Sequence, residues 1–314
     1  ILPIISDFIL HPKFKEENLA LYKKIRIKDL EYNEQKTEFR ATQLMLHAMF
    51  GDGHTAGQFS TKENLCAITI GQMDAFHQTS FVAENVSIFA TGNIDYPLQR
   101  LIFKLFEQIP YRQASTVLPH IDMPFDHAPV IKGTISTAIQ STICLAMPHI
   151  GYQDQDKRDF SVLSTILGGY FGSRLMQRLR EKEGYTYGIS CGSVYFGGQS
   201  LFMMDSNVNA KDTNAAIEAC FEEMQILQDK RVSFEELESA RNYIIGDMLR
   251  DVENSVSYMK QFAFWNLHGF DETEFQTQIS HIRSITPDRI QQLAKDYLSR
   301  NKFTLVIVNS GDVF

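Results

Sequence analysis

The sequence predicts an α+β protein made of two similar halves. Three observations support this prediction: several stretches have the 3.6-residue periodicity of amphipathic helices, others have the composition of β-strands, and one helix-then-strand segment occurs twice. The chain has 314 residues, of which 44% are hydrophobic and 22% are charged. This composition is typical of globular proteins, and the length is sufficient for two domains with sizeable hydrophobic cores.

Helical periodicity occurs along much of the chain, and two of the predicted helices have clear start signals. The sequence from Ser233 to Glu236 is a capping box, in which the hydroxyl and the carboxylate each bond a free backbone N–H group. Thr286 precedes Pro287, which places a capping residue before a proline at the first helical position. The predicted helices are residues 1–10, 17–30, 41–50, 156–167, 173–182, 213–227, 235–249 and 288–298, and the predicted strands are residues 86–90, 141–146, 185–191, 199–207 and 303–308.

The repeated segment occurs at Thr69–Asp95 and again at Thr286–Asp312. Each copy predicts a helix followed by a strand that ends near a glycine and an aspartate. At nearly the same offset, Leu19–Leu30 aligns with Leu237–Met248, and two matches at one offset indicate duplicated domains. The coincident apolar pairs are Met73/Ile290, Phe76/Leu293, Phe81/Leu298, Val86/Phe303, Ile88/Leu305 and Phe89/Val306.

The repeat also predicts the domain organisation. We expect residues 1–112 to form the second part of an N-terminal domain, residues 113–127 to form a polar, proline-containing linker, and residues 128–314 to form a C-terminal domain. Residues 1–112 match only the later part of the second copy. We therefore expect the equivalent first part, roughly 90 residues, to lie upstream of this chain.

The charge and cysteine patterns argue against several classes of function. The net charge is −8 and the basic residues are scattered rather than clustered, so we expect no nucleic-acid partner. No apolar run approaches ~20 residues, so no membrane span is predicted. The four cysteines lie far apart, which favours buried free thiols over a cysteine zinc site. They leave the compartment open between the cytoplasm and the periplasm.

Three segments, in order along the chain, resemble the pitrilysin/insulinase family of zinc metallopeptidases. The first is Leu10–Phe14 with the helix that follows it, the second is Ile70–Asp95, and the third and most specific is Leu163–Tyr187. The resemblance is to the branch that contains mitochondrial processing peptidase and its bacterial relatives. It implies two similar domains, each a mainly antiparallel sheet covered by helices, with the first domain incomplete here.

The resemblance also implies where a zinc site would lie. In active family members two histidines of a His-x-x-Glu-His motif and a glutamate on a later helix hold the zinc ion. This chain contains no such histidine motif, which would belong to the upstream segment. On the later helix, Tyr22 occupies the position of a helper glutamate and Asp29 that of the zinc ligand. Aspartate can bind zinc but is one methylene shorter, so we expect no catalytic zinc in this chain and a solvated or capping role for Asp29.

The most specific segment predicts a candidate substrate-binding pair. Gly184 should end the helix over residues 173–182 in the left-handed conformation, and Tyr185, Tyr187 and Ile189 should then share one face of a strand. From the residues alone, Arg180 can be a surface ion-pair partner and Tyr187 a half-buried strand residue. The resemblance implies instead that both bind the substrate backbone, because a guanidinium can hold a peptide carbonyl and a phenol can donate to a developing oxyanion.

These observations lead to one functional hypothesis and two alternatives. The first is a non-zinc, substrate-binding subunit of a heteromeric zinc endopeptidase that acts on peptides, with zinc supplied by a homologous zinc-motif subunit. This inactive subunit would function as part of a heterodimer or of a homodimer. The alternatives are a self-sufficient zinc metallopeptidase whose histidine motif lies upstream, and a structural or assembly protein of the same fold.

Overall fold

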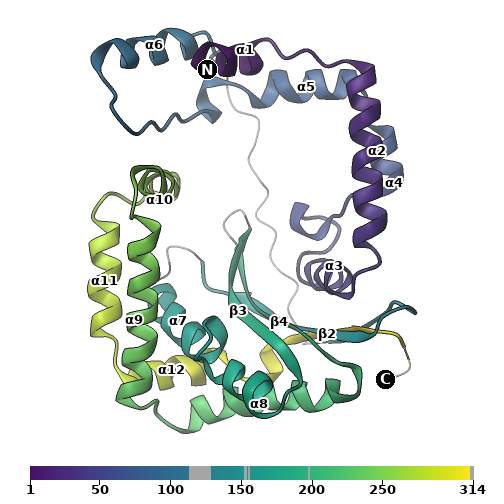
Figure 1. Cartoon of the computed structure of the whole chain (residues 1–314), viewed down its shortest axis with the longest axis vertical. Helices are drawn as coiled ribbons and strands as arrows, with labels where there is room; N and C mark the ends of the chain where they lie inside the picture. Colours follow the sequence, from purple (N-terminus) through teal and green to yellow (C-terminus); the bar gives the residue numbers. More distant parts are fainter. Residues whose placement is uncertain (113–128, 152–153, 155, 197–198, 312–314) are drawn as a thin grey trace. The chain divides into compact units, whose positions relative to one another are not determined.

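The computed structural model describes residues 1–112, 129–151, 154, 156–196 and 199–311 (Figure 1). These residues form an α+β fold, as predicted, and divide into two compact units. Unit 1 contains Ile1–Tyr32, the described residues from Ser60 to Arg112, and Val252–Phe264. Unit 2 contains Asn33–Phe59 and the described remainder of the chain. The predicted linker, residues 113–127, lies outside the described residues.

Unit 2 is built on a five-stranded, mainly antiparallel sheet. The strand order is β1-β5-β2-β4-β3, and β1 pairs with β5 in parallel whereas the other three pairings are antiparallel. Strands β2 to β5 confirm the four strands predicted in the C-terminal half. The strands are β1 (Val130–Thr134), β2 (Gln140–His149), β3 (Thr186–Phe196), β4 (Gln199–Asn209) and β5 (Thr304–Asn309).

Helices cover one face of this sheet and enclose the larger hydrophobic core (Figure 1). Phe160 and Phe202 meet edge to face in this core, with ring centroids 4.9 Å apart. The cap predicted at Thr286 is present, because its hydroxyl accepts a hydrogen bond from the N–H of Arg289. The covering elements are α7 (Asp156–Ser164), α8 (Thr213–Asp229), α9 (Phe234–Asp251), α11 (Glu274–Ser284), α12 (Pro287–Tyr297) and two π-helices, η3 (Thr165–Gly169) and η4 (Met176–Lys182).

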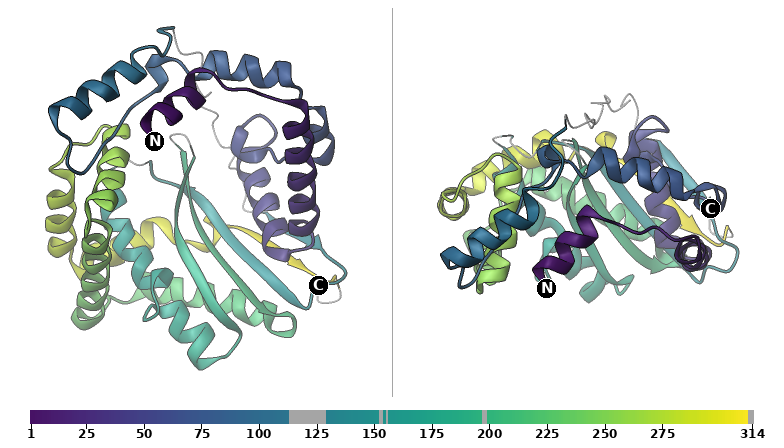
Figure 2. Two further views of the ribbon diagram at one scale, coloured as in Figure 1. Left: turned by 45° about the horizontal axis from the view of Figure 1, so that its top comes forward. Right: turned by 90° about the horizontal axis from the view of Figure 1, so that it is seen from above.

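The opposite face of the sheet is partly covered by one helix, α3 (Thr37–Phe50), which packs against β1, β2 and β5 (Figure 2). Met45, Met49 and Phe50 are buried in this second core. Gly133 of β1 allows α3 to approach closely, since a Cβ atom at this position would lie 2.8 Å from Leu44 Cδ1. Strand β1 was not predicted from the sequence. It is an edge strand of the sheet and packs against α3.

Unit 1 consists mainly of helices. Helix α5 begins with a capping box between Thr69 and Gln72, so both copies of the repeat begin with a threonine-capped helix. Residues 86–90 were predicted as a strand but have no ladder partner among the described residues, and Ile88 is exposed. The helices are α1 (Leu2–Leu10), α2 (Glu16–Asn33), α4 (Lys62–Ala67), α5 (Ile70–Ser80), α6 (Tyr96–Phe106) and most of α10 (Ser255–Leu267).

No described helix combines the length and apolar composition needed to cross a membrane.

Candidate functional site

The segment from η3 through η4 to the start of β3 contains the predicted substrate-binding pair, Arg180 and Tyr187. The helix predicted over residues 173–182 is largely a π-helix, η4, and such helices are rare and frequently found at functional sites. Leu175 and Leu179 are fully buried and attach it to the larger core of unit 2. Gly184 has a φ angle of 68°, which confirms the predicted left-handed exit.

Two arginines of this segment are held by carboxylates from other helices. Arg174 forms a bidentate pair with Glu236 of α9, at 2.7 Å and 2.9 Å. Arg178 pairs with Glu222 and Glu223 of α8, at 2.5 Å and 3.2 Å. Burial alone would lower the pKa of the Arg174 guanidinium, but the hydrogen bonds that it donates to Glu236 raise this pKa overall. The hydrogen bonds that Arg178 donates to Glu222 and Glu223 likewise raise its pKa, against the effect of burial. Both side chains therefore fix the segment to its surroundings.

Arg180 differs from these two arginines. Among the described residues its carboxylate partner is Glu181, the next residue in the chain, with Arg180 Nε 3.3 Å from Glu181 Oε1. The Arg180 side chain is 38% exposed, and its guanidinium lies over the ring of Phe171, 4.7 Å from the ring centroid. Within the run from residue 174 to residue 180, Arg180 is thus the arginine that can bind a group from outside the protein.

Tyr187 lies at a β-bulge in β3. The pairing of Thr186 with Val208 and of Ile189 with Ser206 leaves two residues of β3 opposite one residue of β4. Thr186 and Ile189 are buried, whereas Tyr187 is 89% exposed. The expectation that Tyr185, Tyr187 and Ile189 share one face was therefore wrong, because the extra residue shifts the alternation. The bulge turns the Tyr187 phenol toward solvent.

A buried hydroxyl cluster holds this bulge. The Thr186 hydroxyl donates to the carbonyl oxygen of Asn207 at 2.6 Å and accepts from the N–H of Gly188 at 3.1 Å. The Ser206 hydroxyl lies 2.9 Å from the Thr186 hydroxyl. These bonds satisfy backbone groups that the interrupted ladder leaves unpaired.

The structure places Arg180 and Tyr187 on two elements, η4 and β3, that pack against each other within unit 2. No hydrogen bond between the two side chains is present in the part of the chain that the structure describes. Both side chains are accessible, which leaves their donors available to a ligand. Phe171 was not predicted from the sequence to be part of this region; its position between Gly169 and Gly172, inside the segment Leu163–Tyr187, was the available signal.

The predicted zinc-ligand position lies on α2 in unit 1. The Asp29 carboxylate is half exposed and pairs with Arg26 of the same helix at 3.5 Å. Tyr22, at the helper position, is exposed and has no carboxylate. Across the described residues, no three histidine, cysteine, aspartate or glutamate side chains come together in a way that could hold a metal ion. The described residues around Asp29 therefore do not fit a catalytic zinc ion.

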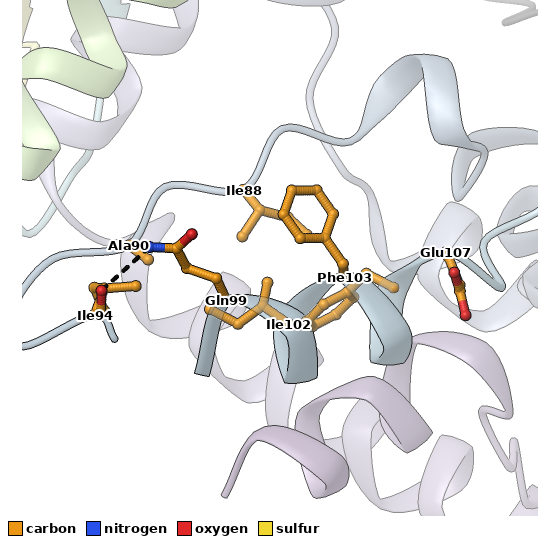
Figure 3. Close-up of a pocket in the computed structure, with 8 residues that line it drawn as sticks. Ile88, Ala90, Ile94, Gln99, Ile102, Phe103 and Glu107 are labelled. Atoms are coloured by element: carbon orange, nitrogen blue, oxygen red, sulfur yellow. Dashed lines mark hydrogen bonds between the residues drawn. The ribbon is translucent and has the colours of Figure 1, made fainter. Parts of the chain in front are cut away.

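Unit 1 also contains apolar cavities. One, of about 350 Å³, lies between α6 and residues 88–94 and is lined by Ile88, Ile102 and Phe103 (Figure 3). The Gln99 side chain crosses its edge and donates a hydrogen bond to the carbonyl oxygen of Ile94 at 3.2 Å. A larger one, of about 720 Å³, lies between α1 and α5. Both linings are mainly hydrophobic, which suits packing or apolar binding better than acid–base chemistry.

Comparison with known proteins identifies the family. A family model described as the peptidase M16 inactive domain matches residues 67–244, which is more than half of the chain. This chain belongs to the M16 peptidase inactive-domain family. The matched residues include η3, η4 and β3. The resemblance to zinc peptidases inferred from the sequence is therefore confirmed.

Relatives of low sequence identity match most of this chain. An uncharacterized zinc protease of Streptomyces coelicolor is 21% identical over 98% of this chain and 68% of its own length. A probable inactive metalloprotease of Bacillus subtilis, YmfF, is 20% identical over 71% of this chain and 52% of its own length. The crystal structure of a peptidase M16 inactive domain from Pseudomonas fluorescens has the same fold, with a TM-score of 0.88 at 20% identity, over 98% of this chain and 74% of that chain.

Proposed function

We propose that this chain is the non-zinc, substrate-binding subunit of an M16 zinc endopeptidase that acts on peptides. The observation that carries the proposal is the contrast between the arginines of one segment. Arg174 and Arg178 are held by glutamates of other helices, whereas Arg180 has a single, adjacent carboxylate partner among the described residues. The exposed Tyr187 on the neighbouring strand supplies a second donor.

These two side chains have the chemistry that peptide-backbone recognition needs. A guanidinium offers five N–H donors in a fixed plane and can hold a peptide carbonyl. A phenol hydroxyl can donate to the oxyanion that develops when that carbonyl is attacked, and donors aimed at such a charge lower the barrier. Because every peptide has backbone carbonyls, such a site binds through the main chain and tolerates many side chains.

The zinc ion and the general base would come from a homologous subunit with a His-x-x-Glu-His motif. Three facts support this division of roles: the match to an M16 inactive domain, the pairing of Asp29 with Arg26, and the absence of a three-donor metal group among the described residues. The partner is then a zinc-motif homologue, or a second copy of this chain if an upstream segment supplies that motif. Zinc would be a cofactor of the assembled peptidase.

The proposal predicts the effect of substitutions in the assembled peptidase. Arg180→Ala and Tyr187→Phe should each lower kcat/KM for a fluorogenic peptide by at least about tenfold, because removal of a transition-state donor costs this much or more. Arg250→Ala is the matched control, since Arg250 is also exposed and also pairs with a near neighbour, Asp247. Turnover that is unchanged in both variants would contradict a catalytic role for the pair.

Purification of the natural full-length protein tests the division of roles. Affinity isolation from its source should return a zinc-motif homologue, and the separated chain should contain no stoichiometric zinc after dialysis. Stoichiometric zinc that is lost in Asp29→Asn would instead make this chain a zinc peptidase in its own right. A stable complex without any zinc peptidase would favour a structural or assembly role.

A further inference from the structure

The turn between η3 and η4 presents an exposed aromatic ring beside Arg180. Phe171 lies in this turn and is 57% exposed, although it is a large apolar residue. The Arg180 guanidinium lies over its ring at 4.7 Å from the centroid. Such a cation–π contact is favourable because the face of the ring is the negative end of its quadrupole. We propose that Phe171 positions Arg180 and supplies an apolar contact for a side chain of the bound peptide. This proposal rests on the proposed function of Arg180 in peptide binding.

The turn that contains Phe171 is fixed on both sides. Before it, the Tyr170 ring packs on the Tyr243 ring of α9, with centroids 5.0 Å apart. After it, Arg174 forms the bidentate pair with Glu236, also on α9. The N–H of Ser173 closes the turn by donating to the carbonyl oxygen of Tyr170 at 3.0 Å. The turn that contains Phe171 is therefore attached to α9 on both sides, which limits how far the Phe171 ring can move.

Phe171 constrains Arg180 more than its acidic neighbour does. Glu181 follows Arg180 directly and both side chains are substantially exposed, so water weakens the attraction between them. An arginine with that single contact would sample many rotamers, and each side chain that binding immobilises reduces affinity. Contact of one guanidinium face with a ring limits these rotamers. The N–H groups, which lie in the guanidinium plane, keep their freedom to donate to a peptide carbonyl.

The exposed part of the Phe171 ring indicates the class of peptide. A carbonyl held by Arg180 would place a neighbouring substrate side chain next to this ring. An apolar or aromatic side chain at that position would bury area against the ring, whereas a small or acidic side chain would not. We therefore expect a preference for peptides with an apolar residue adjacent to the carbonyl that Arg180 binds.

The test uses Phe171→Leu and Phe171→Tyr in the assembled peptidase, with peptides that contain a phenylalanine or an alanine at each position in turn. Leucine keeps apolar bulk but has no ring. We expect Phe171→Leu to raise KM about threefold to tenfold for the preferred phenylalanine peptide, while Phe171→Tyr stays within about twofold of the natural protein. In the Phe171→Leu variant, the preference for phenylalanine over alanine should shrink.

A double variant separates positioning from general damage to the fold. If the ring acts through Arg180, adding Phe171→Leu to Arg180→Ala should leave the alanine-peptide kinetics of Arg180→Ala unchanged. Phe234→Leu, another exposed phenylalanine of unit 2, should leave kinetics unchanged. An unchanged KM in Phe171→Leu, or fully additive losses in the double variant, would overturn the inference. If Arg180→Ala itself has no effect, the proposed function fails instead.

Discussion

At the scale of single residues, His149 has an unusual environment. It lies at the end of β2 against the ring of Phe160, with centroids 4.0 Å apart, and near the rings of Phe202 and Tyr297. Neither ring nitrogen has a hydrogen-bond partner among the described residues, and both nitrogens are buried. Burial lowers the pKa of His149 to about 4 because the charged form loses its hydration. The imidazole is therefore neutral at pH 7.

This environment predicts a loss of stability in mild acid. Because the pKa of His149 is lower in the folded protein than the usual histidine value of about 6.5, the unfolded form takes up a proton first as the pH falls. The free energy of unfolding should be unaffected by His149 above about pH 6.5 and should fall by at most about 3 kcal/mol toward pH 4. Urea unfolding at several pH values measures this change.

His149→Leu should remove this part of the pH dependence, whereas His11→Leu, at an exposed position, should keep it. If the natural protein and the His149→Leu variant lose the same free energy of unfolding between pH 7 and pH 4.5, burial of the neutral His149 imidazole does not cause the loss of stability in acid.

At the scale of elements, the bulge of β3 decides the direction of Tyr187. A regular strand would have placed Tyr187 on the face that contains Ile189, which is buried in the larger core. The extra residue of the bulge keeps Thr186 and Ile189 inside and turns Tyr187 out. One backbone irregularity thus makes a tyrosine hydroxyl available for binding.

The hydroxyl of Thr186 should be important for this geometry. Thr186→Val keeps the shape of the side chain but removes the bonds to Asn207 and Gly188, so we expect the protein to lose about 1–3 kcal/mol of stability. Thr42→Val removes an exposed hydroxyl that bonds the carbonyl oxygen of Glu38, and should change stability by less than about 0.5 kcal/mol. Equal urea midpoints for Thr186→Val and the natural protein would exclude a stabilising role for the cluster.

At the scale of the whole molecule, α3 belongs to the unit built on the C-terminal sheet. It precedes the predicted linker in sequence, yet it packs on β1, β2 and β5 and closes the second core of unit 2. Phe50 is 3% exposed and meets the ring of Phe196 at 5.1 Å between centroids. Helices from distant parts of the chain thus pack on the two faces of this sheet.

Phe50→Ala should therefore destabilise unit 2 by about 3–5 kcal/mol, since it removes a large buried ring and leaves a cavity. Trp265, the one tryptophan of the chain, is buried in unit 2, and its fluorescence can follow the unfolding. Phe76→Ala, at an exposed position of unit 1, is the control and should leave this transition in place. If Phe50→Ala lowers the free energy of unfolding by less than about 1 kcal/mol, packing of α3 on the sheet does not stabilise unit 2 as expected.

Much of the local structure was predictable from the sequence. The threonine cap at Thr286 and the left-handed Gly184 depend on contacts within one or two turns, so the residue types at those positions are sufficient to predict them. The strands of the C-terminal half were predictable because their β-branched and aromatic residues suit a buried sheet. The order of motifs along the chain was sufficient to indicate the M16 family.

Features that depend on distant partners required the tertiary structure. The bulge at Tyr187 exists because one residue of β4 lies opposite two residues of β3. Residues 86–90 do not form a strand because they have no ladder partner among the described residues. Residues 130–134 form the strand β1 because they pair with β5. The sequence by itself thus determined which residues, Arg180 and Tyr187, were candidates for binding. Only the tertiary structure decided that Arg180 forms no ion pair with a carboxylate from another described element, and that Tyr187 faces solvent. The reason is that ion pairing and burial depend on residues far apart in the chain.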